Sequence, residues 1–134
     1  MIQKEEVMGL LLEACPSFKE KWVEHRHYWE QENLLYVDLS EFARHVLDLH
    51  QRHKTLEFSA IFDVVERLHL EGDDFVREAT TIGLLESLQN IAGNNQVDIE
   101  ALTKYLKPES AKWWRELNLF WENKIPYLGS TMNK

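Results

Sequence analysis

DDFVREATTIGLLESLQNIA, residues 73–92, is the stretch of this chain that decides its fold. Apolar residues recur through it at the three- and four-residue spacing of a helix, and they surround most of the helix axis. No wide charged face remains, which is typical of a helix that is buried on more than one side. The spacing therefore predicts a central helix over residues 73–92, against which the other segments pack.

Both ends of this helix carry local signals. Asp73 or Asp74 can accept hydrogen bonds from the first free amides, and Gly93 before two asparagines is typical of a left-handed C-cap. Small residues recur at every fourth position along one side, and they are Ala79, Gly83 and Ser87. We expect a neighbouring segment to approach closely along these small residues.

Helical periodicity continues outside this stretch. It predicts further helices over residues 2–14, 17–29, 38–53, 56–69, 98–106 and 108–124, whereas residues 34–37 form only a short β-like run. Ser17 with Glu20, and Asp38 with Glu41, have the spacing of capping boxes that begin two of these helices. The sequence predicts an all-α fold of about seven helices in a compact α-α superhelical or orthogonal bundle.

Length and composition point to one domain. The chain has 134 residues, 44% of them hydrophobic, and we expect a single helical domain over residues 1–127 with a flexible tail over 128–134. The single cysteine, Cys15, excludes an internal disulfide framework and favours a reducing, cytoplasmic location. No apolar run approaches the roughly 20 residues of a membrane helix. Acidic residues in the first helix argue against a secretion signal.

The negative charge is confined to the middle of the chain. Residues 55–100 hold ten acids and two bases, a net of −8, whereas the remaining residues hold thirteen of each. Such a field repels nucleic acid and attracts a basic protein partner, although it also suits a solvated surface that only aids solubility. The acids around the predicted turn before residue 73 are the expected partner-binding residues: Glu66, Glu71, Asp74 and Glu78.

Aromatic residues suggest a second kind of contact. Trp22, His25 and Trp29 share one face of the helix over 17–29, and Trp113 and Trp121 belong to a broad aromatic face over 108–124. We expect most tryptophans to pack between these two helices, and any exposed one, Trp113 or Trp121 first, to anchor a partner. His25 is expected either to bond a backbone carbonyl in the core or to line an aromatic pocket with Trp22 and Trp29.

No set of residues has the spacing of a catalytic or metal site. His45, His50 and His53 do not share one helix face, so a solvated helix end is expected there, without a metal or a cofactor. Cys15 follows the first helix instead of beginning one, so nothing lowers its pKa there toward a reactive thiolate. Phosphate loops and nucleophile elbows are also missing from the sequence. The chain is therefore expected not to be an enzyme.

One segment resembles a known repeat. FSAIFDVVERLHLEGDDFVREATTIGLLESL is similar to a HEAT-type helical hairpin, in which an aspartate followed by a Val-Arg pair begins the second helix. Asp73 or Asp74, Val76 and Arg77 match this pattern. The resemblance implies a HEAT-like hairpin at the centre of the fold, with the arginine able to reach an acid on an adjacent repeat.

The chain as a whole resembles a family of small, uncharacterised, all-helical bacterial proteins. The segments EACPSF, SEFARHVLDL, VREATTIGLLESLQNIA and KPESAKWWRELNLFW carry this resemblance. Small acidic proteins of this type are often similar to immunity proteins that neutralise a toxin. The leading hypothesis is therefore a non-enzymatic module that binds a basic protein, such as a toxin. The alternatives are a small HEAT-like adaptor or scaffold, and an enzyme or ligand-binding protein with a pocket of tryptophan and histidine.

Overall fold

The computed structural model describes residues 1–28 and 34–123, without the side chains of residues 28 and 121–123. The boundary at 127 and 128 predicted for the tail lies outside this range. Within the described residues the only β-type pairing is an isolated bridge between Ile2 and Gly72, so the all-α prediction is confirmed. The elements in chain order are α1 (Lys4–Ala14), η1 (Pro16–Phe18), α2 (Lys19–Tyr28), α3 (Leu35–Gln51), α4 (Phe58–Glu71), α5 (Asp74–Glu78), η2 (Ala79–Leu85), α6 (Glu86–Asn94), η3 (Glu100–Tyr105) and α7 (Pro108–Asn123).

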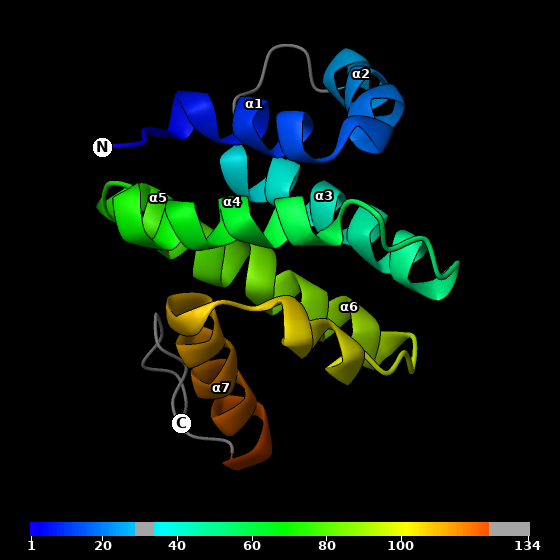
Figure 1. Ribbon diagram of the computed structural model, residues 1–134, viewed down its shortest axis with the longest axis vertical. Helices are drawn as coiled ribbons and strands as arrows, with labels where there is room; N and C mark the ends of the chain where they lie inside the picture. Colours follow the sequence, from blue (N-terminus) through cyan, green and yellow to red (C-terminus); the bar gives the residue numbers. More distant parts are fainter. Residues whose placement is uncertain (29–33, 124–134) are drawn as a thin grey trace.

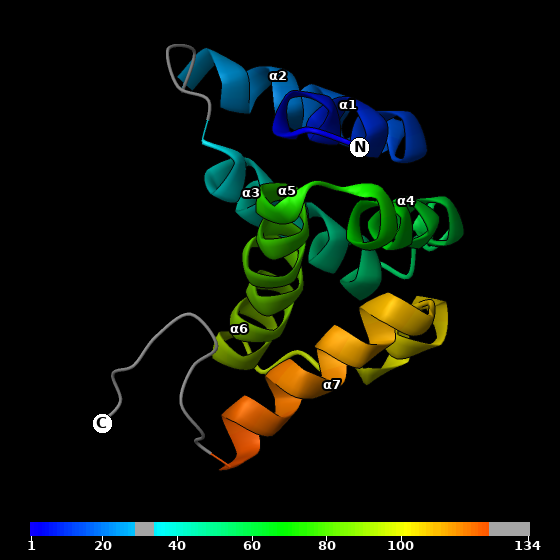
Figure 2. The same ribbon diagram turned by 90° about the vertical axis from the view of Figure 1, so that its left-hand side faces the viewer.

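The helices follow one another along the long axis of the molecule (Figure 1). α1 and α2 lie at one end, α3 and α4 lie in the middle, and α7 lies at the other end. α5, η2 and α6 join without a break and run from the middle layer toward α7 (Figure 2). No helix formed by the described residues is both long and apolar enough to cross a bilayer.

The continuous helix of α5, η2 and α6 is the central helix predicted for residues 73–92. It contacts α1, α3, α4 and α7, and Ala79 and Leu85 are fully buried in it. Asp73 caps its start by accepting a hydrogen bond from the Val76 amide at 2.9 Å. Gly83 packs closely against α3, as expected, because a Cβ there would lie 3.3 Å from a methyl carbon of Leu39.

The middle of this helix is wider than an α-helix. Residues Ala79–Leu85 form the π-helix η2, in which a bond such as that from the Glu86 amide to the Thr81 carbonyl spans five residues. Sequence periodicity does not reveal this widening, because the apolar residues still recur at helical spacing. π-Helical turns are rare and occur frequently at functional sites.

The predicted end of the central helix is wrong by a few residues. α6 continues through Gly93, and Gln96 has the positive φ angle, at 56°. The amides of Val97 and Gln96 donate to the carbonyls of Ala92 and Gly93, at 2.8 and 3.2 Å, which is a Schellman motif. The expected motif is therefore present, but Gln96 takes the left-handed position that was assigned to Gly93.

The amino terminus is fastened to the turn between α4 and α5. The Ile2 amide donates to the Glu71 carbonyl at 2.8 Å, and the Asp73 amide donates to the Ile2 carbonyl at 3.0 Å. Gly72 lies between them, and a Cβ there would come within 2.5 Å of the Leu68 carbonyl oxygen. A glycine is required for this close passage, which also positions Asp73 to cap the central helix.

Both predicted capping boxes are wrong, because tertiary contacts engage the capping side chains. α2 begins after the turn η1, and the Ser17 hydroxyl donates to Glu57 of a distant segment. α3 begins earlier than predicted and takes in the short β-like run. Asp38 is buried within α3 and is bonded to His25 at 2.7 Å.

Among the tryptophans whose side chains the structure describes, the expected packing between α2 and α7 does not occur. These helices lie at opposite ends of the molecule, as Figures 1 and 2 both show. Trp22 and Trp113 are half-buried at separate places on the core, whereas Trp114 is buried. Trp29 lies outside the described residues, and the side chain of Trp121 is likewise not described.

Candidate functional site

A cleft of about 450 Å³ lies where the central helix passes α4 and α7, and this volume is within the usual range of ligand sites. Its lining residues come from four elements and are His69, Asp74, Arg77, Glu78, Thr81, Ile82, Glu109 and Trp113. Asp74, Glu78 and Trp113 were predicted from the sequence to bind a partner. The fold brings these three residues together in one hollow.

The buried end of the cleft is formed by His69, a residue that sequence reasoning overlooked. His69 is 3% exposed, and its ring nitrogens lie 2.9 Å from the Ser110 hydroxyl and 3.1 Å from the Thr81 hydroxyl. The Ser110 hydroxyl donates its proton to Glu66, at 2.9 Å. It follows that His69 Nδ1 donates to Ser110, and that Nε2 accepts from Thr81. The sequence does carry a signal for it: His69 has helical spacing from Phe62 and the apolar residues between them, which places its side chain on the inward face of the helix.

The His69 ring is neutral at neutral pH. Burial lowers its pKa to about 4, although the negative charges of Glu66 and Glu109 act in the opposite direction. Both ring nitrogens already have hydrogen-bond partners, so neither is free to take a proton from a ligand. His69 therefore provides a fixed, uncharged floor for the cleft.

Glu66 is not available to a partner, so its assignment as a partner-binding residue is wrong. It is 8% exposed, and its carboxylate accepts hydrogen bonds from the amides of Glu109 and Ser110, at 3.0 and 2.9 Å. These amides are among the first free donors of α7, so Glu66 caps this helix from α4. Burial acts to raise the pKa of Glu66, but these bonds hold it below its ordinary value.

The rim of the cleft is acidic and ordered. Asp74 pairs with Arg77 at 2.8 Å, and Glu109 accepts a hydrogen bond from the indole nitrogen of Trp113 at 3.2 Å. Lys112 lies 5.0 Å from the centroid of the Trp113 ring, a cation–π arrangement. The rim therefore holds an indole in a fixed orientation among carboxylates, and this indole already attracts a cation of its own chain.

Glu71 is exposed but does not line the cleft. It pairs with Arg67 at 3.3 Å and lies beside the amino terminus, in a shallow hollow with Met1 and Ile2. Two acids of the same turn, Glu71 and Asp74, thus point to different surfaces. The sequence alone does not separate them, because their directions depend on the turn at Gly72.

His25 is a core residue, but its partner differs from the one expected. It is 8% exposed and bonds the carboxylate of Asp38 instead of a backbone carbonyl. Trp22 is adjacent, with ring centroids 5.8 Å apart. A second hollow is lined by Trp22 and Asp38 without His25, so the predicted tryptophan and histidine pocket is only partly formed among the described residues.

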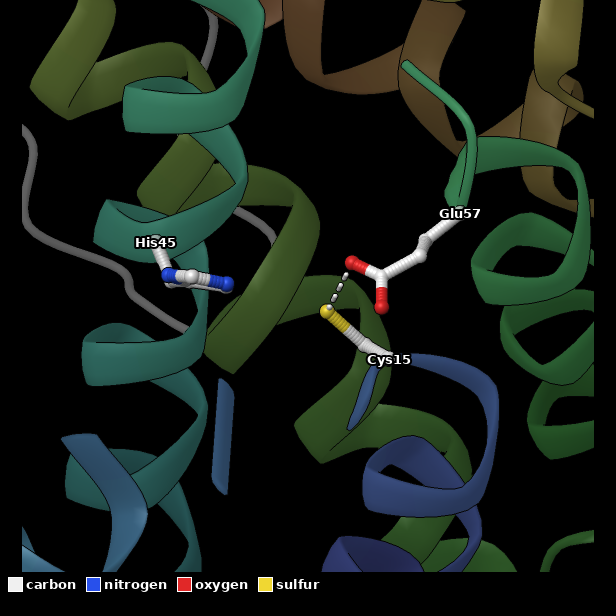
Figure 3. A group of neighbouring side chains, drawn as sticks. All are labelled: Cys15, His45 and Glu57. Carbon is white, nitrogen blue, oxygen red and sulfur yellow. Dashed lines mark hydrogen bonds between the residues drawn. The ribbon is translucent and has the colours of Figure 1, made fainter. Parts of the chain in front are cut away.

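A second group of side chains comes together at the opposite end of α4, where this helix begins. Cys15 follows α1, His45 lies on α3, and Glu57 immediately precedes α4; their ligand atoms all lie within 4.8 Å of one another. Figure 3 shows these side chains pointing toward a common centre, with the Cys15 thiol donating to the Glu57 carboxylate at 3.4 Å. His45 is 4% exposed, so the expectation of a solvated helix end is wrong for this histidine.

Ser17 connects this group. Its hydroxyl lies 2.5 Å from a carboxylate oxygen of Glu57, 2.9 Å from Nε2 of His45 and 3.6 Å from the sulfur of Cys15. Because its single proton goes to Glu57, Nε2 of His45 must donate to Ser17, which leaves Nδ1 as a bare acceptor. This Nδ1 atom is buried and has no hydrogen-bond partner among the described residues.

The group does not have the geometry of a nucleophilic triad. Burial raises the pKa of the Cys15 thiol to about 11, so the thiolate is rare at neutral pH. Burial, with the nearby charge of Lys21, lowers the pKa of His45. Glu57 is bonded to Ser17 and Cys15 and does not orient His45, as the acid of a triad does. A thiol, an imidazole and a carboxylate are, however, the donor types that bind transition metals.

Two comparisons with known proteins find no match, and one identifies a family. A family model described as Domain of unknown function (DUF7674) matches residues 8–122, which is more than half of the chain. Comparisons with curated proteins and with solved structures find no match. The chemistry of the cleft and of the second group is therefore the basis for assigning a function.

Proposed function

We propose that this chain, which belongs to the family described as Domain of unknown function (DUF7674), is a non-enzymatic protein-binding module for a basic partner. The cleft between the central helix and α7 receives a lysine or arginine side chain of that partner. The carboxylates at its rim attract the cation, and the indole of Trp113 packs against the aliphatic part of the side chain.

One observation carries this proposal: the acidic residues of α5 and the aromatic residue of α7 line the same cleft. Three carboxylates, Asp74, Glu78 and Glu109, and one guanidinium, Arg77, line the cleft, a net charge of −2. Lys112 lies beside the rim, 3.7 Å from Glu109, and reduces the net charge there to −1. Tryptophan is enriched among the residues that dominate binding energy at protein interfaces. Charge of one sign at a concave site also raises the association rate of an oppositely charged partner.

The hydrogen bonds at the base of the cleft support binding over catalysis. Ser110 is fully buried and donates to Glu66, so its hydroxyl is not offered to a substrate. Both nitrogens of His69 are engaged, and its low pKa removes it as a proton acceptor at neutral pH. A rigid, neutral floor beneath an acidic rim suits recognition of a cationic side chain.

Within this proposal, neutralisation of a basic toxin is the specific form that we favour, and the cytoplasm is the expected location. A HEAT-like scaffold is the second form. It has less support, because Arg77 pairs with Asp74 of its own helical turn instead of an acid on another repeat. The protein encoded by the adjacent gene is the first partner to test, since a large toxin there favours immunity and its absence favours a scaffold.

The cleft itself is tested with two short peptides, one of which contains arginine where the other contains citrulline. Citrulline has nearly the same shape as arginine but carries no charge. We expect the arginine peptide to shift the indole N–H resonance of Trp113, assigned with a Trp113→Phe variant, and the citrulline peptide to leave it in place. Glu78→Gln should weaken binding of the arginine peptide, because it removes one rim charge. Glu71→Gln is the matched control, since Glu71 is an acid of the same turn outside the cleft.

Two results contradict the proposal. Equal shifts with both peptides would mean that charge does not direct binding to the cleft. Equal losses in Glu78→Gln and Glu71→Gln would mean that the whole acidic surface acts as a diffuse field, without a defined site.

A further inference from the structure

We propose that Cys15, His45 and Glu57 form a metal-binding site for Zn²⁺ at the junction of α1, α3 and α4. This site is separate from the cleft and does not rest on the proposed protein-binding function. It holds three chain segments together, since Cys15 ends α1, His45 lies in the middle of α3 and Glu57 precedes α4.

The distances suit a tetrahedral ion. Zn²⁺ binds sulfur at about 2.3 Å and carboxylate oxygen at about 2.0–2.2 Å, so two such ligands lie about 3.5 Å apart around it. The sulfur of Cys15 and the nearer oxygen of Glu57 are 3.4 Å apart. Figure 3 shows the imidazole of His45 directing a ring nitrogen into the same space. The sulfur and the oxygen therefore already have the spacing of two zinc ligands, and all three ligand atoms lie within 4.8 Å of one another.

The donor types select the metal. A thiolate sulfur with an imidazole nitrogen favours Zn²⁺ and other thiophilic ions over Mg²⁺ and Ca²⁺, which prefer oxygen ligands. The Ser17 hydroxyl lies next to all three ligand atoms and takes the fourth position as a weak, neutral ligand. Ser17 is exposed, so the ion has a path from solvent to this position.

Metal binding changes the protons of the group in a defined way. The Cys15 thiol loses its proton to solvent and becomes the thiolate ligand. Glu57 accepts hydrogen bonds from both Ser17 and Cys15, so it binds the ion as a carboxylate without losing a proton. The proton on Nε2 of His45 moves to Nδ1, and Ser17 keeps its proton. One proton is therefore released for each ion bound.

The surroundings of His45 set the strength of the site. A metal-bound histidine usually donates its second ring nitrogen to an acceptor, and loss of such a partner weakens metal binding by about 10–100-fold. Nδ1 of His45 has no partner among the described residues. We therefore expect one Zn²⁺ per chain with an affinity below that of a fully supported structural zinc site, and a chain that folds without the ion.

The test uses the full chain and Co²⁺, which replaces Zn²⁺ and has a visible spectrum. We expect a sulfur-to-cobalt charge-transfer band that saturates at one ion per chain and disappears when Zn²⁺ is added. Calorimetry of Zn²⁺ binding in buffers of different ionisation enthalpy should show release of one proton. The apparent affinity should rise about tenfold for each pH unit while the thiol is protonated.

Variants separate a metal site from a hydrogen-bond network. Cys15→Ser should lose the charge-transfer band. Glu57→Gln should lower the Zn²⁺ affinity by more than about tenfold, because loss of a residue that only hydrogen-bonds a metal ligand already lowers the affinity by that factor. His27→Gln, which changes an exposed histidine outside the group, should leave the affinity unchanged. If Cys15→Ser fails to fold, the wild-type cobalt spectrum and Glu57→Gln still decide the question.

Two outcomes overturn the inference. The absence of a sulfur-to-cobalt band in the wild-type chain would mean that Cys15, His45, Glu57 and Ser17 form only a hydrogen-bond network. If Glu57→Gln and Cys15→Ser both leave the Zn²⁺ affinity unchanged, the metal binds at a different site on the protein.

Discussion

The carboxylate of Glu66 accepts hydrogen bonds from the backbone amides of Glu109 and Ser110, and in this way α4 caps the start of α7. An N-cap is usually supplied by the residue that precedes the helix, whereas here it comes from a residue 44 positions away. This contact fixes the wall of the cleft that carries Trp113. It also removes Glu66 from the surface that a partner meets.

Glu66→Gln should therefore destabilise the fold. The substitution keeps the shape of the side chain but replaces a buried carboxylate, whose hydrogen bonds to amides contribute about 1.5–3 kcal/mol each in favourable cases, with a neutral group. We expect a loss of about 1–3 kcal/mol in the free energy of unfolding, measured with urea. Glu71→Gln, on the exposed side of the same helix end, should change it by less than about 0.5 kcal/mol. Equal stabilities would mean that α7 does not depend on this cap.

Stability should fall in mild acid because of His69. The unfolded chain binds a proton at His69 near the ordinary pKa of 6.5, whereas the folded chain does so only near pH 4. Between these values the unfolded state binds more protons, so the free energy of unfolding decreases as the pH falls from 6.5 to 4. His69 alone accounts for about 3 kcal/mol of this decrease, at about 1.4 kcal/mol per pKa unit.

The measurement is urea unfolding of the wild type and His69→Gln across this pH range. In the variant, the free energy of unfolding should change less steeply with pH. Part of the pH dependence should remain because of His45, whose pKa is also lowered by burial. His27→Gln is the control for replacing a histidine by glutamine, at an exposed position outside the cleft. A slope that is unchanged in His69→Gln would show that this histidine titrates alike in both states.

Gly83→Leu tests the contact between the central helix and α3. A Cβ at Gly83 would already lie 3.3 Å from Leu39 and 3.4 Å from Tyr36, so a larger side chain has no room. We expect a loss of about 1–3 kcal/mol, the usual effect of overpacking a core. Gly93→Leu is the matched control, since nothing lies within 4 Å of a Cβ at Gly93. Thermal unfolding of both variants gives the comparison, and equal midpoints would mean that the helix does not pack tightly at Gly83.

Charge reversal separates the cleft from the rest of the acidic surface. Asp74→Lys and Glu78→Lys should slow association with a basic partner, first tested as the product of the adjacent gene, while Glu71→Lys should slow it less. The effect should shrink in high salt, because the Debye length falls from about 10 Å at 0.1 M to about 3 Å at 1 M. Trp113→Ala should instead speed dissociation, as loss of a buried anchor does. Unchanged rates in Glu78→Lys at low salt would mean that the acidic rim is only a solvated surface.

Several features of this protein were predictable because they depend on residues close together in the chain. The periodicity of residues 73–92 predicts the central helix, and Asp73 caps it as expected, since the cap reaches only as far as Val76. Close packing at Gly83 was also predictable, because a small residue on a buried helix leaves space that a neighbour fills. Asp74, Glu78 and Trp113 were assigned to binding from charge and residue type, but the sequence did not indicate that they share one cleft.

Only the tertiary structure decided which polar side chains meet across the chain. Ser17 and Asp38 have the local spacing of caps, yet Ser17 bonds the half-buried Glu57 and Asp38 bonds the buried His25, because the fold brings these partners from distant segments within reach. Cys15, His45 and Glu57 likewise come from three separate segments of the chain. Sequence periodicity gives the inward face of each helix but not the angle at which two helices cross. The crossing angle sets which inward residues touch, and so the cleft, the cap at Glu66 and the metal-ligand set exist only in the fold.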